Sequence, residues 1–130
     1  MKYGYSKTVN RSVEDLEKGV RASLQEVGFG VLTEINVQKA MKEKLGKSFR
    51  KYKILGACNP SIAFQALSEE TEIGLLLPCN VVVWENDDKT ATVAAIDAKV
   101  MLTVTGRDDM EEMANQINKL LQKAIDSADR

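Results

Sequence analysis

Two Cys-Asn pairs are the residues of this sequence best suited to chemistry. Cys58-Asn59 is followed by a proline and Cys79-Asn80 is preceded by one, so both cysteines and both prolines of the 130-residue chain lie in one stretch. A cysteine thiolate is a nucleophile and a ligand for soft metals, and an asparagine amide donates and accepts hydrogen bonds. The repeated pair therefore marks a candidate site at Cys58, Asn59, Cys79 and Asn80.

Three functions are compatible with two thiols that lie close together. The four residues would line a pocket for a small molecule, with the amides and nearby backbone N–H groups as its polar partners. Alternatively, Cys58 and Cys79 would form a dithiol–disulfide couple, because the dipole of the helix that follows Cys58 favours its thiolate. They would otherwise bind a soft metal ion such as copper(I) or zinc, with further ligands from a carboxylate or a second subunit.

A purely structural interpretation stands beside these three. Each cysteine would then be a small buried apolar residue, and each asparagine a helix cap or turn former. Because two thiols alone are an incomplete metal site, we rank metal binding below a ligand or redox pocket.

The strands that carry the cysteines decide whether the thiols meet. Residues 52–57 form a predicted strand that runs into Cys58, and the apolar run after Cys79 predicts a strand over residues 80–85, with Trp84 in the core. If these strands are antiparallel neighbours, the thiols lie at the same end of the sheet. If the strands are parallel, the thiols lie at opposite ends and no common site forms.

The remaining elements predict one α+β domain over residues 1–130. Alternating patterns predict strands over 3–9, 29–35 and 90–96, and helical spacing of apolar residues predicts helices over 13–27, 37–45, 60–67 and 108–127. Residues 98–102 form either a short helix capped by Asp97 or part of a strand. The two long helices each have one apolar face, so we expect a mostly antiparallel sheet covered by both on one side.

Composition excludes several classes of function. The chain has no histidine, which excludes histidine-based catalytic dyads and imidazole metal ligands. Its net charge of −1 gives no overall field to attract nucleic acid. No apolar run approaches the roughly 20 residues that span a bilayer, and we see no signal peptide. We expect a cytoplasmic protein with reduced cysteines that is not a conventional enzyme, and the sequence indicates no particular cofactor.

One segment is locally basic. Residues 39–53 contain seven lysines and arginines against the single acid Glu43. This segment would be either a patch for phosphate or nucleic acid or, as we favour, an ordinary solvated surface. It also leaves open a third role for the protein, a structural or assembly module with a basic face.

The central stretch resembles a known family, "domain of unknown function 302". The resemblance is carried by Gly-Ala-Cys-Asn-Pro at 56–60 and Gly-Leu-Leu-Leu-Pro-Cys-Asn-Val at 74–81, and the order of the other elements is compatible over essentially the whole chain. It implies a TATA-binding-protein-like α+β fold with a curved antiparallel sheet, and a homodimer, but no reaction. The sequence departs from the family at Asp97-Ala98, where a proline often follows the aspartate.

Overall fold

The computed structural model describes residues 2–129 and has a five-stranded antiparallel sheet that does not close into a barrel. The strands are β1 (Gly4–Val9), β2 (Gly30–Asn36), β3 (Tyr52–Cys58), β4 (Cys79–Glu85) and β5 (Ala91–Ile96), in the order β1-β5-β4-β3-β2. The predicted α+β class is therefore confirmed, and β3 and β4 are antiparallel neighbours.

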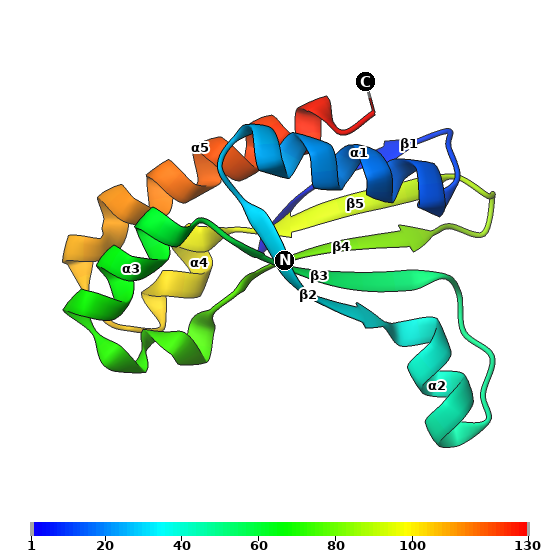
Figure 1. Cartoon of the computed structure of the whole chain (residues 1–130), viewed down its shortest axis with the longest axis horizontal. Coiled ribbons are helices and arrows are strands. Elements are labelled where there is room, and N and C mark those ends of the chain that lie inside the picture. The colour runs from blue at the N-terminus through cyan, green and yellow to red at the C-terminus, as the bar shows by residue number, and fades with distance from the viewer. Residues whose placement is uncertain (1, 130) are drawn as a thin grey trace.

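The two long helices lie side by side over one face of the sheet (Figure 1). They are α1 (Val13–Glu26) and α5 (Glu111–Ser127), and their apolar sides are buried through residues such as Leu16, Leu24 and Leu121. This arrangement is the one expected from their single apolar faces. We call the sheet face beneath them the inner face and the other one the outer face.

Side-chain caps start the helices at the residues that the sequence indicates. The hydroxyl of Ser12 accepts a hydrogen bond from the backbone N–H of Asp15 at 3.0 Å, and the Asn36 side chain accepts one from the N–H of Lys39 at 3.0 Å. Asn36 caps α2 (Val37–Leu45), which ends at Gly46 with a φ of 64°. A left-handed φ of this kind favours glycine, so the helix ends there.

The short helices divide between the two ends of the molecule. At one end, α3 (Pro60–Glu69), η1 (Thr71–Leu76), α4 (Ala98–Thr103) and η2 (Asp108–Met110) gather near the start of α5 (Figure 1). At the other end α2 projects from the body and has no buried residue. Residues 98–103 are helical, so the helix is the correct one of the two structures predicted for this segment. The Asp97 carboxylate caps the helix by accepting hydrogen bonds from the N–H groups of Lys99 and Val100.

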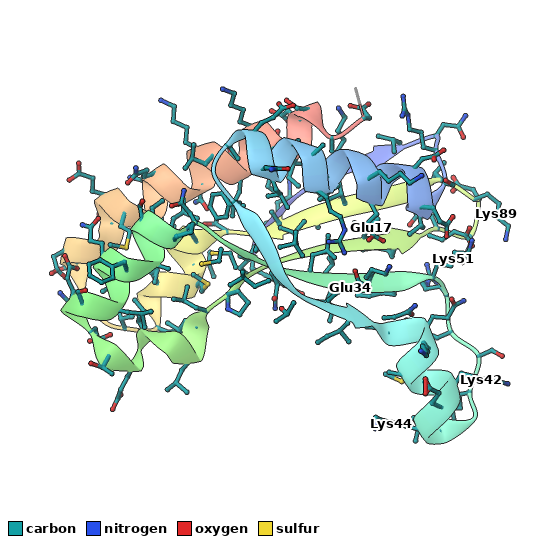
Figure 2. All side chains as sticks on the ribbon, in the orientation of Figure 1. Glu17, Glu34, Lys42, Lys44, Lys51 and Lys89 are labelled. Carbon is teal, nitrogen blue, oxygen red and sulfur yellow. The ribbon has the colours of Figure 1, made fainter. Side chains whose placement is uncertain are left out.

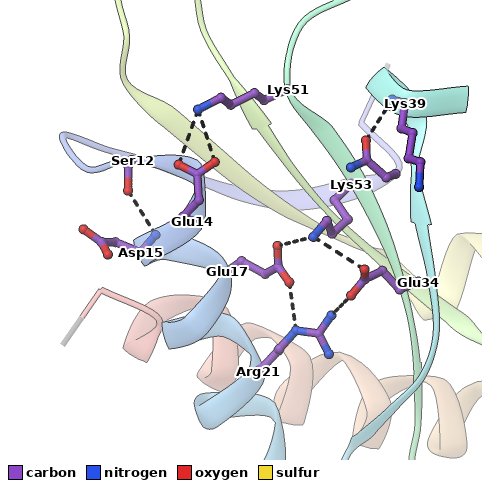
Figure 3. A network of polar contacts seen from close by, with 10 residues as sticks. Ser12, Glu14, Asp15, Glu17, Arg21, Glu34, Lys39, Lys51 and Lys53 are labelled. Atoms are coloured by element: carbon purple, nitrogen blue, oxygen red, sulfur yellow. Dashed lines mark hydrogen bonds and ion pairs between the residues drawn. The ribbon is translucent and has the colours of Figure 1, made fainter. Parts of the chain in front are cut away.

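A network of ion pairs ties α1 to β2 and β3. The Lys53 ammonium lies 3.0 Å from a carboxylate oxygen of Glu17 and 3.5 Å from one of Glu34. The Arg21 guanidinium binds the same two carboxylates, so the four side chains form a closed ring (Figure 3). Hydrogen bonding to Glu17 is the main cause that raises the pKa of Lys53. The network fixes how α1 sits on the half of the sheet that carries β3.

Part of the basic segment is neutralised within the chain. Four of its seven cationic side chains form ion pairs: Lys39 with Glu43, Arg50 with Asp87, Lys51 with Glu14, and Lys53 with Glu17 and Glu34. Lys42 and Lys44 extend from α2 away from the sheet (Figure 2). The pairing reduces the charge available to a polyanion and favours the interpretation as a solvated surface.

Within residues 2–129, no helix covers the outer face of the sheet (Figure 1). Trp84 lies there, half-buried and stacked on Tyr52 with ring centroids 5.8 Å apart, and its indole N–H donates to Asn86. The prediction of a core position for Trp84 is therefore wrong. The alternation of β4 gives the reason: Val81 and Val83 occupy the inner face, so the residue after Val83 points outward.

Candidate functional site

Antiparallel pairing of β3 with β4 brings the two cysteines to one end of the sheet. Cys58 is the last residue of β3 and Cys79 the first of β4, and Ala57 pairs directly with Cys79. Ala57 and Cys79 are both buried, whereas Cys58 is half-buried, and neither cysteine is in a disulfide. The arrangement that a common site requires is thus present.

Both cysteines line an apolar cavity of about 290 Å³ between this end of the sheet and the helices around it. The wall includes residues from β2, β3, β4, α3, η1, α4 and α5, which are far apart in the sequence. None of the lining side chains is charged, and Thr33 and Asn59 are its only hydroxyl and amide. The lining residues are Phe29, Leu32, Thr33, Ala57, Cys58, Asn59, Ile62, Ala63, Ala66, Leu67, Ile73, Leu77, Pro78, Cys79, Met101, Leu102, Met113 and Ile117.

Asn59 shapes the cavity by starting α3. Its side-chain oxygen accepts a hydrogen bond from the N–H of Ile62 at 3.2 Å, and Pro60 occupies the first helical turn, where a missing N–H costs nothing. The helix then brings Ile62, Ala63 and Ala66 to the wall of the cavity. The side-chain oxygen of Asn59 therefore has a structural role, and its amide nitrogen is the part available to a ligand.

Asn80 lies apart from the other three predicted site residues. It is exposed, pairs with Gly56 on the neighbouring strand and does not line the cavity. Successive residues of a strand point to opposite faces, so Cys79 on the inner face sends Asn80 to the outer face. The structure brings Cys58, Asn59 and Cys79 together and leaves Asn80 outside.

Close packing at Gly56 holds the entrance of β4 against β3. A Cβ atom at this position would lie 2.1 Å from the hydroxyl oxygen of Thr33 and 2.7 Å from a ring carbon of Pro78. A larger residue at this position would have to displace both side chains. The glycine thus allows Pro78 to pack onto β3 directly before Cys79.

Burial dominates the electrostatics of the Cys79 thiol. It raises the pKa of Cys79 to about 11, and a smaller contribution comes from the neighbouring Cys58. The same interaction shows that the two side chains are close enough to influence each other. At neutral pH the Cys79 sulfur is therefore a protonated thiol in an apolar wall and a weak nucleophile.

The far wall of the cavity, which the sequence did not assign to a site, comes from α4 and α5. The side-chain oxygen of Asn118 accepts a hydrogen bond from the N–H of Ala98 at 2.7 Å, and its amide donates to Asp97 at 2.9 Å. The Asn118 amide is the main cause that lowers the pKa of the Asp97 carboxyl. This contact fixes α4 on α5, so that Met101 and Met113 reach the cavity.

Comparison with known proteins gives a family and a fold but no activity. The search of curated proteins finds no match. A similar solved structure is the crystal structure of an uncharacterized conserved protein of the DUF302 family from Bacillus stearothermophilus, with a TM-score of 0.91 and 27% identity over 98% of this chain and 99% of that one. The family model "Domain of unknown function DUF302" matches residues 5–128. The chain therefore belongs to the DUF302 family.

Proposed function

We propose that the protein binds a small, uncharged and largely apolar molecule in the cavity lined by Cys58, Asn59 and Cys79. The observation that carries this proposal is an open volume of about 290 Å³ whose wall contains no charged side chain. Leu32 and Leu67 in this wall are 69% and 41% exposed, so the cavity opens to solvent with an apolar rim. Exposed apolar surface that gathers in a hollow is typical of a binding site. Binding sites for small molecules are concave and mostly apolar, with a few polar groups.

The lining limits the chemistry of the ligand. A charged group would lose its hydration without gaining a counter-charge, which is strongly unfavourable. The polar partners available are the two thiols, the hydroxyl of Thr33 and the free half of the Asn59 amide. The volume lies near the lower end of the range for ligand pockets, roughly 300–1,000 Å³, so the ligand is a short chain or a compact ring system.

A thiol-redox function is the alternative use of the same cysteines, and the electrostatics weigh against it. Thiol–disulfide exchange requires a thiolate, and burial holds Cys79 in its protonated form at neutral pH. The two free thiols suit a reducing compartment, which supports our proposal of a cytoplasmic location.

The uncharged fluorescent probe phenylnaphthylamine tests the proposal directly. We expect saturable binding of one probe per chain, and we expect Ala63→Phe to weaken it at least about tenfold, because the new ring would occupy space that the probe needs. Ala63 is half-buried on α3 and lines the cavity. Fluorescence titration, with circular dichroism to verify folding, provides the measurement.

Ala40→Phe is the matched control for this experiment. Ala40 is also a half-buried helical alanine, but it lies on α2 and does not line the cavity. Its variant should bind the probe like the parent protein. Equal loss of binding in both variants, or a parent protein that does not bind the probe, would contradict the proposed function.

We also propose a homodimer formed through the outer face of the sheet. A row of paired apolar residues crosses four strands of this face, namely Ala94, Val82, Ile54 and Ile35. Ile35 is 52% exposed. The row contains no charge, so two copies related by a two-fold axis would meet without repulsion and bury the same residues. A second copy of the chain therefore suits this face.

Sedimentation equilibrium at micromolar concentration checks the dimer. We expect the mass of two chains for the parent protein and of one chain for Ile54→Lys, because the lysine would place two like charges at the centre of the interface. Leu75→Lys is the control, because Leu75 is exposed on η1, away from this face. A monomeric parent protein would rule the dimer out.

A further inference from the structure

Sulfur is concentrated in the wall of the cavity. The chain has two cysteines and five methionines, and four of these seven residues line this one space: Cys58, Cys79, Met101 and Met113. They come from four elements, namely β3, β4, α4 and α5. Packing of separate segments, and not a local sequence motif, therefore gathers these side chains.

The other methionines show that this placement is selective. Met110 is 1% exposed on η2, three residues before Met113, yet it does not line the cavity. Met41 is partly exposed on α2 at the other end of the molecule. Met110 thus has the role of an ordinary core methionine, whereas Met101 and Met113 present their side chains to the same open space as the thiols.

Donors for hard metal ions are missing from this wall. It contains no carboxylate, and within residues 2–129 no group of three or more histidine, cysteine or carboxylate side chains is placed to hold a metal ion. Calcium and magnesium require oxygen ligands, and zinc sites use thiolate, imidazole or carboxylate. Thiolate and thioether sulfur are the soft donors that suit copper(I).

The charge of the cavity also favours a monovalent ion. One thiolate neutralises one copper(I) ion, so the bound unit carries no net charge, and the thioethers add neutral donors. A divalent ion with one thiolate would leave a net charge in an apolar wall, which is costly. Cys58 is the thiol suited to supply the thiolate, because it is half-buried whereas Cys79 is 4% exposed.

We propose that Cys58, Met101 and Met113 form a copper(I) site in this cavity. On binding, the Cys58 thiol releases its proton to solvent and a sulfur–copper bond forms, with no change in oxidation state. The thioether sulfurs of Met101 and Met113 complete the coordination, and the protonated Cys79 thiol lies beside the site without binding the ion. Methionine has three rotatable side-chain bonds, and the cavity provides the space in which both thioethers can turn toward the ion. The inference uses the cavity of the proposed function but does not depend on an organic ligand.

Anaerobic titration with copper(I) against a chromophoric chelator tests the site on the full chain. We expect one ion per chain, with affinity reduced about 100-fold or more by Cys58→Ala and about tenfold by Met101→Leu or Met113→Leu. Cys79→Ala should change the affinity less than either of these methionine variants. Met110→Leu is the matched control, because it replaces a buried methionine outside the cavity and should leave the affinity unchanged. Thermal unfolding of each metal-free variant verifies that it is folded.

Three outcomes would overturn the site. The first is a parent protein that does not bind copper(I), and the second is zinc binding as tight as copper(I) binding. The third is a copper(I) affinity that neither Met101→Leu nor Met113→Leu changes. Phenylnaphthylamine binding by the metal-free protein separates this inference from the proposed function. Probe binding without copper binding would remove only the metal site, and copper binding without probe binding would remove only the organic ligand.

Discussion

Replacing Gly19 by alanine is expected to destabilise the protein by about 3 kcal/mol. In most helix interiors this change is favourable by roughly 0.5–1 kcal/mol, because alanine loses less conformational entropy than glycine. Here a Cβ atom would lie 1.8 Å from the backbone oxygen of Ala128, a distance that no rotamer can relieve. The clash therefore exceeds the gain in helix propensity.

The end of α5 can relieve this clash only by giving up contacts with β1. Ala128 is 2% exposed, the Tyr5 hydroxyl donates to Asp126 at 2.7 Å, and Lys7 forms an ion pair with Asp129 at 2.8 Å. Displacement of the last turn would loosen these three interactions together. The substitution thus destabilises the contact between α1 and α5 whichever way the chain responds.

Urea unfolding at neutral pH measures this effect. Gly30→Ala is the control, because a Cβ atom at Gly30 has no other atom within 4 Å, and we expect a change within about 0.5 kcal/mol. A Gly19→Ala protein as stable as the parent would show that α1 and α5 do not approach as closely as described.

Alkaline pH is expected to destabilise the parent protein more than a Cys79→Ala variant. Burial raises the pKa of the folded thiol to about 11 from an ordinary value near 9, so the unfolded chain loses this proton first. The stability associated with the neutral thiol is complete below pH 9 and is lost as the pH rises toward 11. The parent protein should lose about 2 kcal/mol more than the variant between roughly pH 8 and pH 10.5.

Urea unfolding at the two pH values, with a reductant present, gives this difference. Lysines and tyrosines titrate in the same range in both proteins, so only the difference between them reports on Cys79. Cys58→Ala should retain most of the alkaline loss, because burial and not the neighbouring thiol is the main cause of the shift. Identical pH dependence in the parent and in Cys79→Ala would contradict a buried thiol.

Local signals in the sequence were sufficient to predict most of the fold. The capping side chains of Ser12, Asn36 and Asn59 each bind a backbone N–H three positions away, so a cap can be recognised without knowledge of the rest of the chain. The hairpin of β4 and β5 joins strands through a short turn and is equally local. The apolar faces of α1 and α5 then required a sheet to cover.

The candidate site was only partly predictable, because its walls are distant in sequence. The strand prediction began at residue 80, whereas β4 begins at Cys79 and pairs there with Ala57. Alternation from Cys79 onward places Cys79 and Asn80 on opposite faces of the sheet, and a strand predicted from residue 80 does not show this. Helical spacing assigned Met113 to an apolar face, but no local pattern shows that this face borders an open space.

Trp84 illustrates a second limit of sequence patterns. A run of apolar residues predicts a strand that is buried on both sides, and such runs are typical of sheets with helices on both faces. In this protein helices cover one face, so the alternate residues Val82 and Trp84 lie on the uncovered side. Whether Trp84 is covered depends on how many layers the domain has. The number of layers is a property of the whole chain and not of the strand that carries Trp84.

Xenon binding in crystals of the protein is the most direct test of the central claim, that the end of the sheet holds an open apolar chamber. Xenon requires neither a particular ligand nor a polar partner, and it occupies dry cavities lined by apolar side chains. We predict one strongly occupied xenon site bordered by Cys58, Cys79 and Ile73, and its loss in Ala63→Phe. An empty site in the parent protein, with the lining side chains packed against one another, would contradict the account.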